Sequence, residues 1–458
     1  MNTDTRTSKL RVLFVPDSAY WVTATIARQI ARHNPWIEPT ICSHSVLPEL
    51  MRRGGHLADR IDVAHFLTPH IGTLLLPEFE GKVPCVTSIY HVEDHRSVEA
   101  EPRSDAVMTI CRQWHDYLAS VGVAPSKLVR ITMGVETEQF RPAQPVERAN
   151  LRARLGLPQE ALVVGFSAKR SSDSYNRKGT DVLVKAITAL RRELPQTACL
   201  IIGPGWSDIV ARQVEQGGVC LHFPFVLDRE DLADVYRCLD LYWVTARIEG
   251  GPVPLIEAMS SGVCCVTTPV GMAPELVRDG ENAFLAPIDD ANIFVERTAA
   301  LATDPDLRRR MAQAARRTIL DGYRWEQTTQ SAWHLYATAI ESFQQRFPQA
   351  VVPRLPERDT FPAARKMDEL SAVPAGLKSW VRAMEDITFM RALQHMGASK
   401  AASCLALRAI CSRPWDRKIW SEAGPSSPLS KVYRGFRMLY RTLKVSTRRR
   451  RGITSPER

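Results

Sequence analysis

Few folds accommodate a chain in which short apolar runs alternate with longer amphipathic stretches, and this 458-residue chain shows that alternation twice. In the first series, apolar runs bounded by Pro, Gly or Asp predict buried strands at residues 11–15, 63–65, 83–88, 106–110 and 129–131. Residues 23–33, between the first two runs, have helical periodicity. Strands that alternate with helices pair in parallel through right-handed crossovers, so this part of the chain predicts an α/β domain.

A second series of the same kind follows. It predicts strands at residues 161–166, 198–202, 219–222, 241–245 and 263–267, and helices at residues 181–193, 229–238 and 254–261. The polar stretch 141–150, which contains Pro142 and Pro145, separates the two series. We therefore expect two Rossmann-like domains, residues 1–144 and 145–325, that face each other across a cleft. Residues 291–347 are predicted to be wholly helical.

The positive charge of the chain is concentrated towards its C-terminus. The net charge is +10, yet residues 351–458 hold 22 Lys and Arg against 9 Asp and Glu, whereas the first 350 residues hold 38 against 41. Prolines recur through residues 348–398 and predict a linker in which no helix persists. Residues 399–458 predict a mostly helical, basic C-terminal extension. The basic character therefore belongs to this extension and not to the two domains.

The extension contains a basic amphipathic pattern at residues 429–451. Apolar residues recur there at spacings of three and four, basic residues repeat at the same spacing, and Arg448 to Arg451 follow without a break. Such a helix suits an anionic membrane surface, where each cation contributes about 1 kcal/mol. The alternative is a helix that docks on the protein itself and leaves a solvated basic end. Nucleic acid is not favoured as a partner, because no recognisable nucleic-acid module accompanies the charge.

Cysteine usage and hydropathy point to the cytoplasm. The ten cysteines include no CxxC pair, the N-terminus is polar, and no apolar run approaches the ~18–20 residues of a spanning helix. We therefore expect a cytoplasmic protein with reduced thiols and no metal site. The basic segment would bring such a protein to the inner face of the membrane.

The most informative motif is RIEGGPVPLIEAMSSG at residues 247–262. It follows a predicted strand and opens a predicted helix, and its carboxylates, Glu249 and Glu257, flank a turn rich in Gly and Pro. Free N–H groups at a helix N-terminus suit a phosphate or a sugar oxygen, and carboxylates accept hydrogen bonds from sugar hydroxyls. A nucleoside-diphosphate sugar fits this combination. For Glu257 alone, the competing interpretation is an acidic residue that only complements the helix dipole.

The whole motif resembles the Glu-x7-Glu signature of the retaining glycosyltransferases of family four, which have the two-domain GT-B fold. Further segments resemble elements of that family, in the same order along the chain: DVAHFLTP at 62–69, PCVTSIYH at 84–91, TMGVETEQFRP at 132–142 and PVGMAPELV at 269–277. The resemblance covers roughly residues 10–340. It also implies that residues 326–347 form the helix that crosses back to the first domain.

The resemblance assigns roles to individual residues. It implies two catalytic residues, Glu249 at the hydroxyls of the donor sugar and His91 across the cleft. It implies substrate binding by Lys169 and Lys178 at the diphosphate, by Glu257 at the ribose, and by Gly250, Gly251 and Val253 in the loop. No metal and no cofactor are expected, because two cations and a helix terminus can stabilise a leaving diphosphate. On residue type alone, His91 could equally be a polar group at a strand end, and the loop with Arg170 and Arg177 a solvated one.

The chain departs from the family pattern at two places that bear on its substrates. Glu249 is followed by Gly-Gly-Pro-Val, and Pro252 has no N–H to offer a sugar hydroxyl, which leaves the donor sugar open. The loop after the first strand has no glycine. Its Tyr20 and Trp21 would either shape an acceptor pocket or join the core.

The expected function is a retaining, metal-independent glycosyltransferase. It would move a sugar from a nucleotide-diphosphate sugar to a hydroxyl of a glycan or lipid-linked acceptor, in cell-envelope polysaccharide or glycolipid synthesis. Two alternatives stay open at this point. One is a nucleotide-sugar epimerase of similar fold, and the other is a non-catalytic protein that associates with lipid or nucleic acid through its basic tail.

Overall fold

The structure, a computed structural model, describes residues 9–19, 21–54, 57–94, 97–170, 177–215, 218–223 and 229–356. Within these ranges no helix is both long enough and apolar enough to span a membrane. The predicted extension 399–458, its basic segment 429–451, most of the linker 348–398, and Tyr20 lie outside the described residues. The predictions made for them remain predictions.

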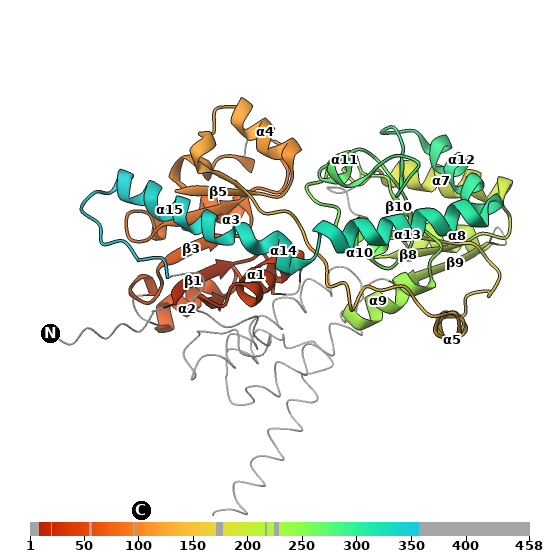
Figure 1. Cartoon of the computed structure of the whole chain (residues 1–458), viewed down its shortest axis with the longest axis horizontal. Helices are drawn as coiled ribbons and strands as arrows, with labels where there is room; N and C mark the ends of the chain where they lie inside the picture. The colour runs from red at the N-terminus through yellow and green to blue at the C-terminus, as the bar shows by residue number, and fades with distance from the viewer. Residues whose placement is uncertain are drawn as a thin grey trace, which may run out of the picture. The chain divides into compact units, whose positions relative to one another are not determined.

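The first domain is built on a parallel sheet of six strands in the order β2-β1-β3-β4-β5-β6 (Figure 1). These strands are β1 (Leu10–Val15), β2 (Ile37–Ile41), β3 (Val63–Phe66), β4 (Cys85–Ser88), β5 (Ala106–Thr109) and β6 (Leu128–Arg130). The main helices among them are α1 (Val22–His33), α2 (Leu47–Gly54), α3 (Pro69–Leu75) and α4 (Arg112–Ser120). The central strands β3, β4 and β5 are buried along their whole length, as parallel sheets covered on both faces are.

The second domain repeats this plan with the strand order β12-β11-β10-β7-β8-β9. Its strands are β7 (Val163–Ser167), β8 (Ala198–Ile202), β9 (Val219–Phe223), β10 (Leu241–Val244), β11 (Cys264–Thr267) and β12 (Phe284–Leu285). The helices around this sheet are α5 (Pro145–Leu155), α7 (Thr180–Glu193), α8 (Ser207–Glu215), α9 (Arg229–Cys238), α10 (Val253–Ser260), α11 (Ala273–Leu276), α12 (Ala291–Thr303) and α13 (Pro305–Gly322). Two parallel six-stranded sheets confirm the predicted α/β class.

All ten predicted strands are present, with boundaries within two residues of those predicted. Two strands escaped the sequence pattern. Strand β2 contains Pro39, which has no N–H to donate, and it lies at the sheet edge, where proline is tolerated. Strand β12 has only two residues, too few for a pattern. The polar stretch predicted as a separator also holds the start of α5, where Pro145 occupies the first turn and Glu147 completes a capping box.

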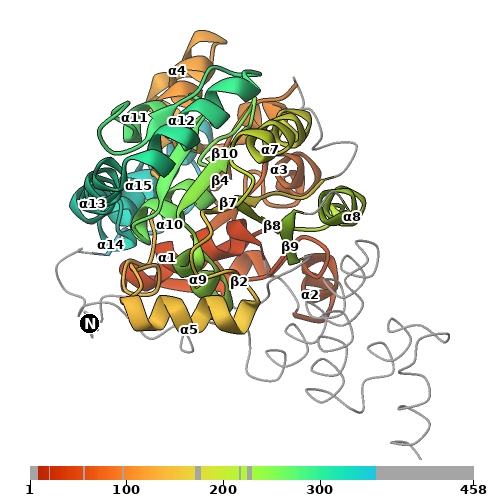
Figure 2. The same ribbon diagram turned by 90° about the vertical axis from the view of Figure 1, so that its right-hand side faces the viewer.

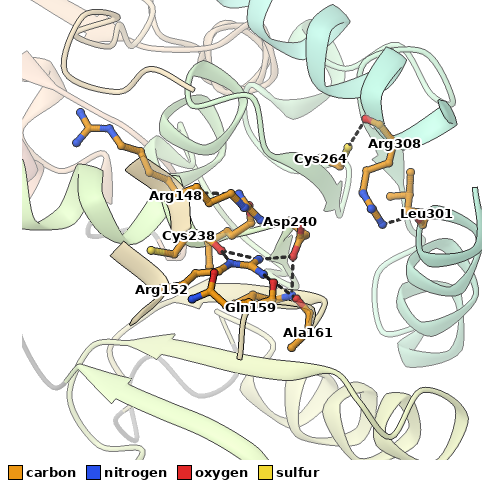
Figure 3. Close-up of polar contacts among 12 residues, drawn as sticks. Arg148, Arg152, Gln159, Ala161, Cys238, Asp240, Cys264, Leu301 and Arg308 are labelled. Carbon is orange, nitrogen blue, oxygen red and sulfur yellow. Dashed lines mark hydrogen bonds and ion pairs between the residues drawn. The ribbon is translucent and has the colours of Figure 1, made fainter. Parts of the chain in front are cut away.

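An arginine cluster fixes α5 to the second domain (Figure 3). Asp240 accepts from Arg148 at 2.7 Å and from Arg152 at 2.7 Å, one guanidinium on each carboxylate oxygen. Both arginines also donate to carbonyls at the C-terminal end of α9, including those of Cys238 and Leu239. Because cations complement the negative end of a helix dipole, the cluster holds α5 beside α9, as Figure 2 shows.

After α13 the chain returns to the first domain through α14 (Trp325–Thr328) and α15 (Ala332–Arg346). Helix α15, cyan in Figure 1, packs on β4 and β5. There the Tyr336 hydroxyl lies 3.0 Å from His65 Nδ1, and Arg346 donates to Asp105 at 2.7 Å. Nε2 of His65 contacts the hydroxyl of Ser88 at 2.9 Å, and burial lowers the pKa of His65 to about 3. His65 is therefore a neutral structural residue.

Candidate active site

A cavity of about 530 Å³ is lined by loops of both domains. In an open parallel sheet, ligands bind beyond the carboxyl ends of the strands where the strand order reverses. The order reverses between β1 and β3 in the first sheet, and between β10 and β7 in the second. The loops after these strands supply lining residues from both sides: Asp17 and Thr68 from the first domain, and Lys178 and Glu249 from the second.

Glu249 is the centre of the second-domain wall. Its carboxylate is buried, pairs with Lys178 Nζ through Oε1, and lies 3.6 Å from Arg177 Nη1 through Oε2. Burial alone would raise the pKa of Glu249, but the charges of Lys178 and Arg177 outweigh burial and lower it. Glu249 is therefore a carboxylate held between two cations.

Backbone contacts fix the loop that carries those cations. Gly179 has φ +59°, and a Cβ on it would lie 1.9 Å from the carbonyl oxygen of Thr245, so no side chain fits there. The Thr245 hydroxyl donates to the carbonyl of Lys178 at 3.0 Å, and Arg247 N donates to the carbonyl of Arg177 at 2.8 Å. The loop is thus bound to the end of β10, directly before Glu249.

The glycines after Glu249 allow the two domains to approach closely. A Cβ on Gly250 would lie 2.2 Å from the carbonyl oxygen of Tyr90, and one on Gly251 would lie 2.7 Å from Met133 Cγ. The Trp114 indole, also from the first domain, donates to the carbonyl of Glu249 at 2.7 Å. Both glycines line the cavity, as a substrate-binding role requires, and both are also packing positions.

Glu257 and Val253 lie on α10, which borders the cavity. Val253 is the first residue of that helix, and Glu257 lies one turn further along it with its side chain buried. The Tyr236 hydroxyl donates to Glu257 Oε2 at 3.1 Å. Because burial raises the pKa of Tyr236 well above its usual value, the hydroxyl keeps its proton and remains a donor. Tyr236 also lines the cavity, and nothing in its sequence neighbourhood indicated it.

His91 lies on the first-domain side and contacts the cations through a third carboxylate. Its Nε2 lies 2.8 Å from Glu93 Oε1, and the same oxygen lies 3.0 Å from Arg177 Nε. Burial and the charge of Arg177 lower the pKa of His91. A neutral His91 therefore donates from Nε2 to Glu93 and keeps Nδ1 as an acceptor.

In the basic loop, the structure places Arg177 at the cavity, and Lys169 is not among the described residues that line it. Arg177, interpreted from sequence as a solvated neighbour, lines the cavity and is only 22% exposed. Its one sequence signal was its place before the Lys178-Gly179 pair. Lys169 is exposed and is not among the described residues that line the cavity. Its neighbour Arg170, interpreted from sequence as part of a solvated loop, pairs with Asp208 at 2.7 Å and is likewise not among the described residues that line the cavity.

The first-domain wall has different chemistry. Trp21 presents an indole that is 38% exposed, and Thr23 and Thr68 add hydroxyls. Asp17 Oδ1 accepts from Ser18 N at 2.8 Å and from the Thr23 hydroxyl. Burial raises the pKa of Asp17. Trp21 therefore borders the cavity, and the predicted core position does not apply to it.

Comparison with known proteins relates the second domain to one family. Residues 147–318 match the sequence model of the family "Glycosyl transferases group 1". This segment of the second domain is similar to group 1 glycosyltransferases. All the second-domain residues discussed above, from Ser167 to Glu257, lie inside this matched segment.

Curated relatives agree with this match. The chain is 30% identical over 232 residues to a GDP-mannose-dependent alpha-(1-6)-phosphatidylinositol monomannoside mannosyltransferase of Mycolicibacterium smegmatis, covering 48% of this chain and 59% of that protein. It is 29% identical over 228 residues to a D-inositol 3-phosphate glycosyltransferase of Streptomyces scabiei, covering 47% and 50%. The chain thus spans between half and three fifths of the length of these relatives.

Solved structures share the two-domain architecture around the matched segment. Anabaena HepE, determined in complex with UDP and glucose, superposes with a TM-score of 0.60 at 16% identity, over 72% of this chain and all of the other. At this identity the likeness concerns the fold alone. The described part of the chain has the GT-B fold.

Proposed function

We propose that this chain is a retaining glycosyltransferase that uses a nucleoside-diphosphate sugar as donor. One observation carries the proposal: within the matched segment, Lys178 and Arg177 meet Glu249 at the edge of a cavity that Glu257 also lines. Cations and carboxylates at the carboxyl ends of parallel strands suit a ligand with both phosphates and hydroxyls.

The donor is proposed to be a nucleoside-diphosphate hexose. The M. smegmatis relative is named as GDP-mannose-dependent, and Anabaena HepE has been determined with UDP-glucose. Lys178 would neutralise the diphosphate together with Arg177, which would take the role that the resemblance assigned to Lys169. Glu257 would accept from the ribose hydroxyls, while Tyr236 holds its second oxygen. Glu249 would accept from hydroxyls of the sugar.

The proposed reaction exchanges one bond at the anomeric carbon for another on the same face. The bond from C1 to the diphosphate oxygen breaks, the acceptor oxygen bonds to C1, and the acceptor proton passes to the departing phosphate. Negative charge grows on the phosphate as the bond breaks, so fixed cations stabilise the transition state more than the ground state. Neutral His91 would accept a hydrogen bond from a sugar hydroxyl through Nδ1 and orient the ring. No metal is assigned to these steps.

The acceptor is proposed to be a hydroxyl of a glycan or lipid-linked molecule, in cell-envelope polysaccharide or glycolipid synthesis. The M. smegmatis relative is named for a phosphatidylinositol monomannoside, which is a lipid-linked sugar. The predicted membrane-binding segment 429–451 would suit such an acceptor. Sedimentation of the full chain with anionic vesicles, compared with a chain that lacks residues 425–458, tests that part separately.

The central experiment measures donor binding. UDP-, GDP-, ADP- and dTDP-sugars are added to the wild type, to Glu257→Ala and to a matched control, Glu296→Ala, whose carboxylate is 64% exposed on α12. We expect one donor class to raise the unfolding temperature of the wild type and the control but not of Glu257→Ala. If no donor stabilises the wild type, the proposal is wrong. Conversion of the donor without any acceptor would instead identify an epimerase.

A further inference from the structure

The cations assigned to the donor diphosphate are already paired with protein carboxylates. Glu249 contacts Lys178 and Arg177, and Glu93 contacts Arg177 through Nε at 3.0 Å. A diphosphate carries about two negative charges at neutral pH and needs the same guanidinium and ammonium groups. A diphosphate bound to these cations therefore competes with the carboxylates that hold them in the free protein.

Of the two carboxylates, Glu93 is the easier to displace. The Glu93 side chain is 44% exposed, whereas the Glu249 side chain is 10% exposed and contacts both cations. Ion pairs with exposed partners contribute little to stability, because water solvates the separated charges well. Removing Glu249 from two cations in a buried position would cost more.

The exchange needs only side-chain motion on the second-domain side. The Arg177 carbonyl accepts from Arg247 N at 2.8 Å and from Ile248 N at 3.3 Å, which fixes the backbone below the guanidinium. Glu93 belongs to the first domain and Arg177 to the second, so their contact also joins the two walls of the cavity. A ligand bound to Arg177 would replace the contact between Arg177 and Glu93.

We propose that Glu93 is an internal competitor of the donor: it holds Arg177 in the free protein, and the diphosphate of the donor takes its place. The inference rests on the proposed function and assigns a role to a residue outside the family motif. Glu93 thereby sets how tightly a nucleoside diphosphate binds. It also keeps Arg177 oriented towards the cavity when no donor is present.

Calorimetric titration of UDP, GDP, ADP and dTDP into the full chain tests the inference. At low ionic strength we expect Glu93→Gln to bind the preferred diphosphate about two- to fivefold more tightly than wild type, the range typical of a partly exposed ion pair. Glu78→Gln, which makes the same change at an exposed first-domain position, should bind like wild type. Equal or weaker binding by Glu93→Gln would overturn the inference.

A double-mutant cycle separates competition from a general change in charge. Arg177→Gln should weaken diphosphate binding, and adding Glu93→Gln to it should restore nothing, because the cation for which Glu93 competes is gone. A gain from Glu93→Gln that survives in the Arg177→Gln background contradicts the inference. If none of UDP, GDP, ADP and dTDP binds any variant, Glu93→Gln included, the proposed function itself fails. Unfolding temperatures of all variants show whether each remains folded.

Discussion

The two walls of the cavity differ both in chemistry and in how the chain builds them. The second-domain wall is ionic, and its key groups come from two short segments, residues 177–179 and 249–257. The first-domain wall presents an indole, an imidazole, hydroxyls and the Asp17 carboxylate, and its residues are spread from residue 17 to residue 133, over α1 and the segments that follow five strands. A wall whose key groups lie in two short segments produces a sequence motif more readily than a wall whose groups are spread over a whole domain.

This difference matches two binding tasks. A diphosphate always carries the same charges, so the wall that binds it needs fixed cations at fixed spacing. A sugar or lipid-linked acceptor varies in shape and charge, and scattered aromatic and hydroxyl groups suit it. We therefore expect changes in the second-domain wall to act on the donor, and changes in the first-domain wall to act on the acceptor.

The largest effect is expected from Lys178→Ala. Removal of one preorganised cation from a developing phosphate charge costs about 10²–10³-fold in rate. The transfer rate is measured with the preferred donor as the rate at which the nucleoside diphosphate is released. Lys185→Ala, an exposed lysine on α7, is the matched control and should retain wild-type turnover. Full activity in Lys178→Ala would show that the Lys178 cation does not contribute to transfer.

The next largest effect is expected from Gly250→Ala, at the point where the two domains approach each other. In Gly250→Ala the new methyl group would meet the Tyr90 carbonyl at 2.2 Å, so the domains must separate or the loop must move. We expect a lower unfolding temperature and donor binding weakened at least tenfold. Gly322→Ala places its methyl group in open space and serves as the control. Normal binding in Gly250→Ala would show that the close approach is dispensable.

The pH dependence of stability should have opposite signs for the two walls. The folded-state pKa of Glu249 is lowered, so its charged form stabilises the fold above the usual pKa, and that stability is lost as pH falls through the lowered value. The folded-state pKa of Asp17 is raised, so its charged form destabilises the fold at neutral pH. At pH 7 we expect Glu249→Gln to decrease the free energy of unfolding and Asp17→Asn to increase it.

Denaturant unfolding between pH 3 and 7 measures both differences. Each should shrink as the pH falls: the Glu249→Gln difference below about 4.5, and the Asp17→Asn difference towards about 3.8. Changes of the same sign at pH 7 would contradict the electrostatic contrast between the walls.

A smaller effect is expected from Trp21→Ala on the first-domain wall. Loss of the indole should raise the KM for the acceptor several-fold and leave the affinity for the donor unchanged. Tyr117→Ala, which removes an aromatic ring that is 42% exposed on α4, is the control. If Trp21→Ala instead weakens binding of the donor, the assignment of donor and acceptor to different walls is wrong.

The smallest effect is expected from chelation. Because cations of the second-domain wall are assigned to the diphosphate, EDTA should leave the transfer rate unchanged, and added Mg²⁺ should not raise it. A loss of activity in EDTA that Mg²⁺ restores would show that these side chains do not suffice.

Sequence patterns predicted the elements that are locally encoded. Continuous apolar runs predicted the strands, and the motif around Glu249 and Glu257 supplies residues 249–254 and 257 of the cavity lining. The pairing of Glu93 with Arg177 was not predictable, because it joins residues far apart in sequence and on different domains. Strand β2 was missed because Pro39 breaks its pattern. Lys169 was assigned to the diphosphate by the family resemblance, and it is not among the described residues that line the cavity, because a resemblance does not reveal which way a loop side chain points.

The return of α15 to the first sheet has a consequence for how the protein folds during synthesis. Growing chains generally fold their N-terminal domain first. Here the first sheet leaves the ribosome while Tyr336 and Arg346, which cover His65 and Asp105, have not yet been made. His65 and Asp105 of the first domain therefore stay uncovered by α15 until the second domain has been translated. The last described helix to be synthesised closes the sheet that was synthesised first.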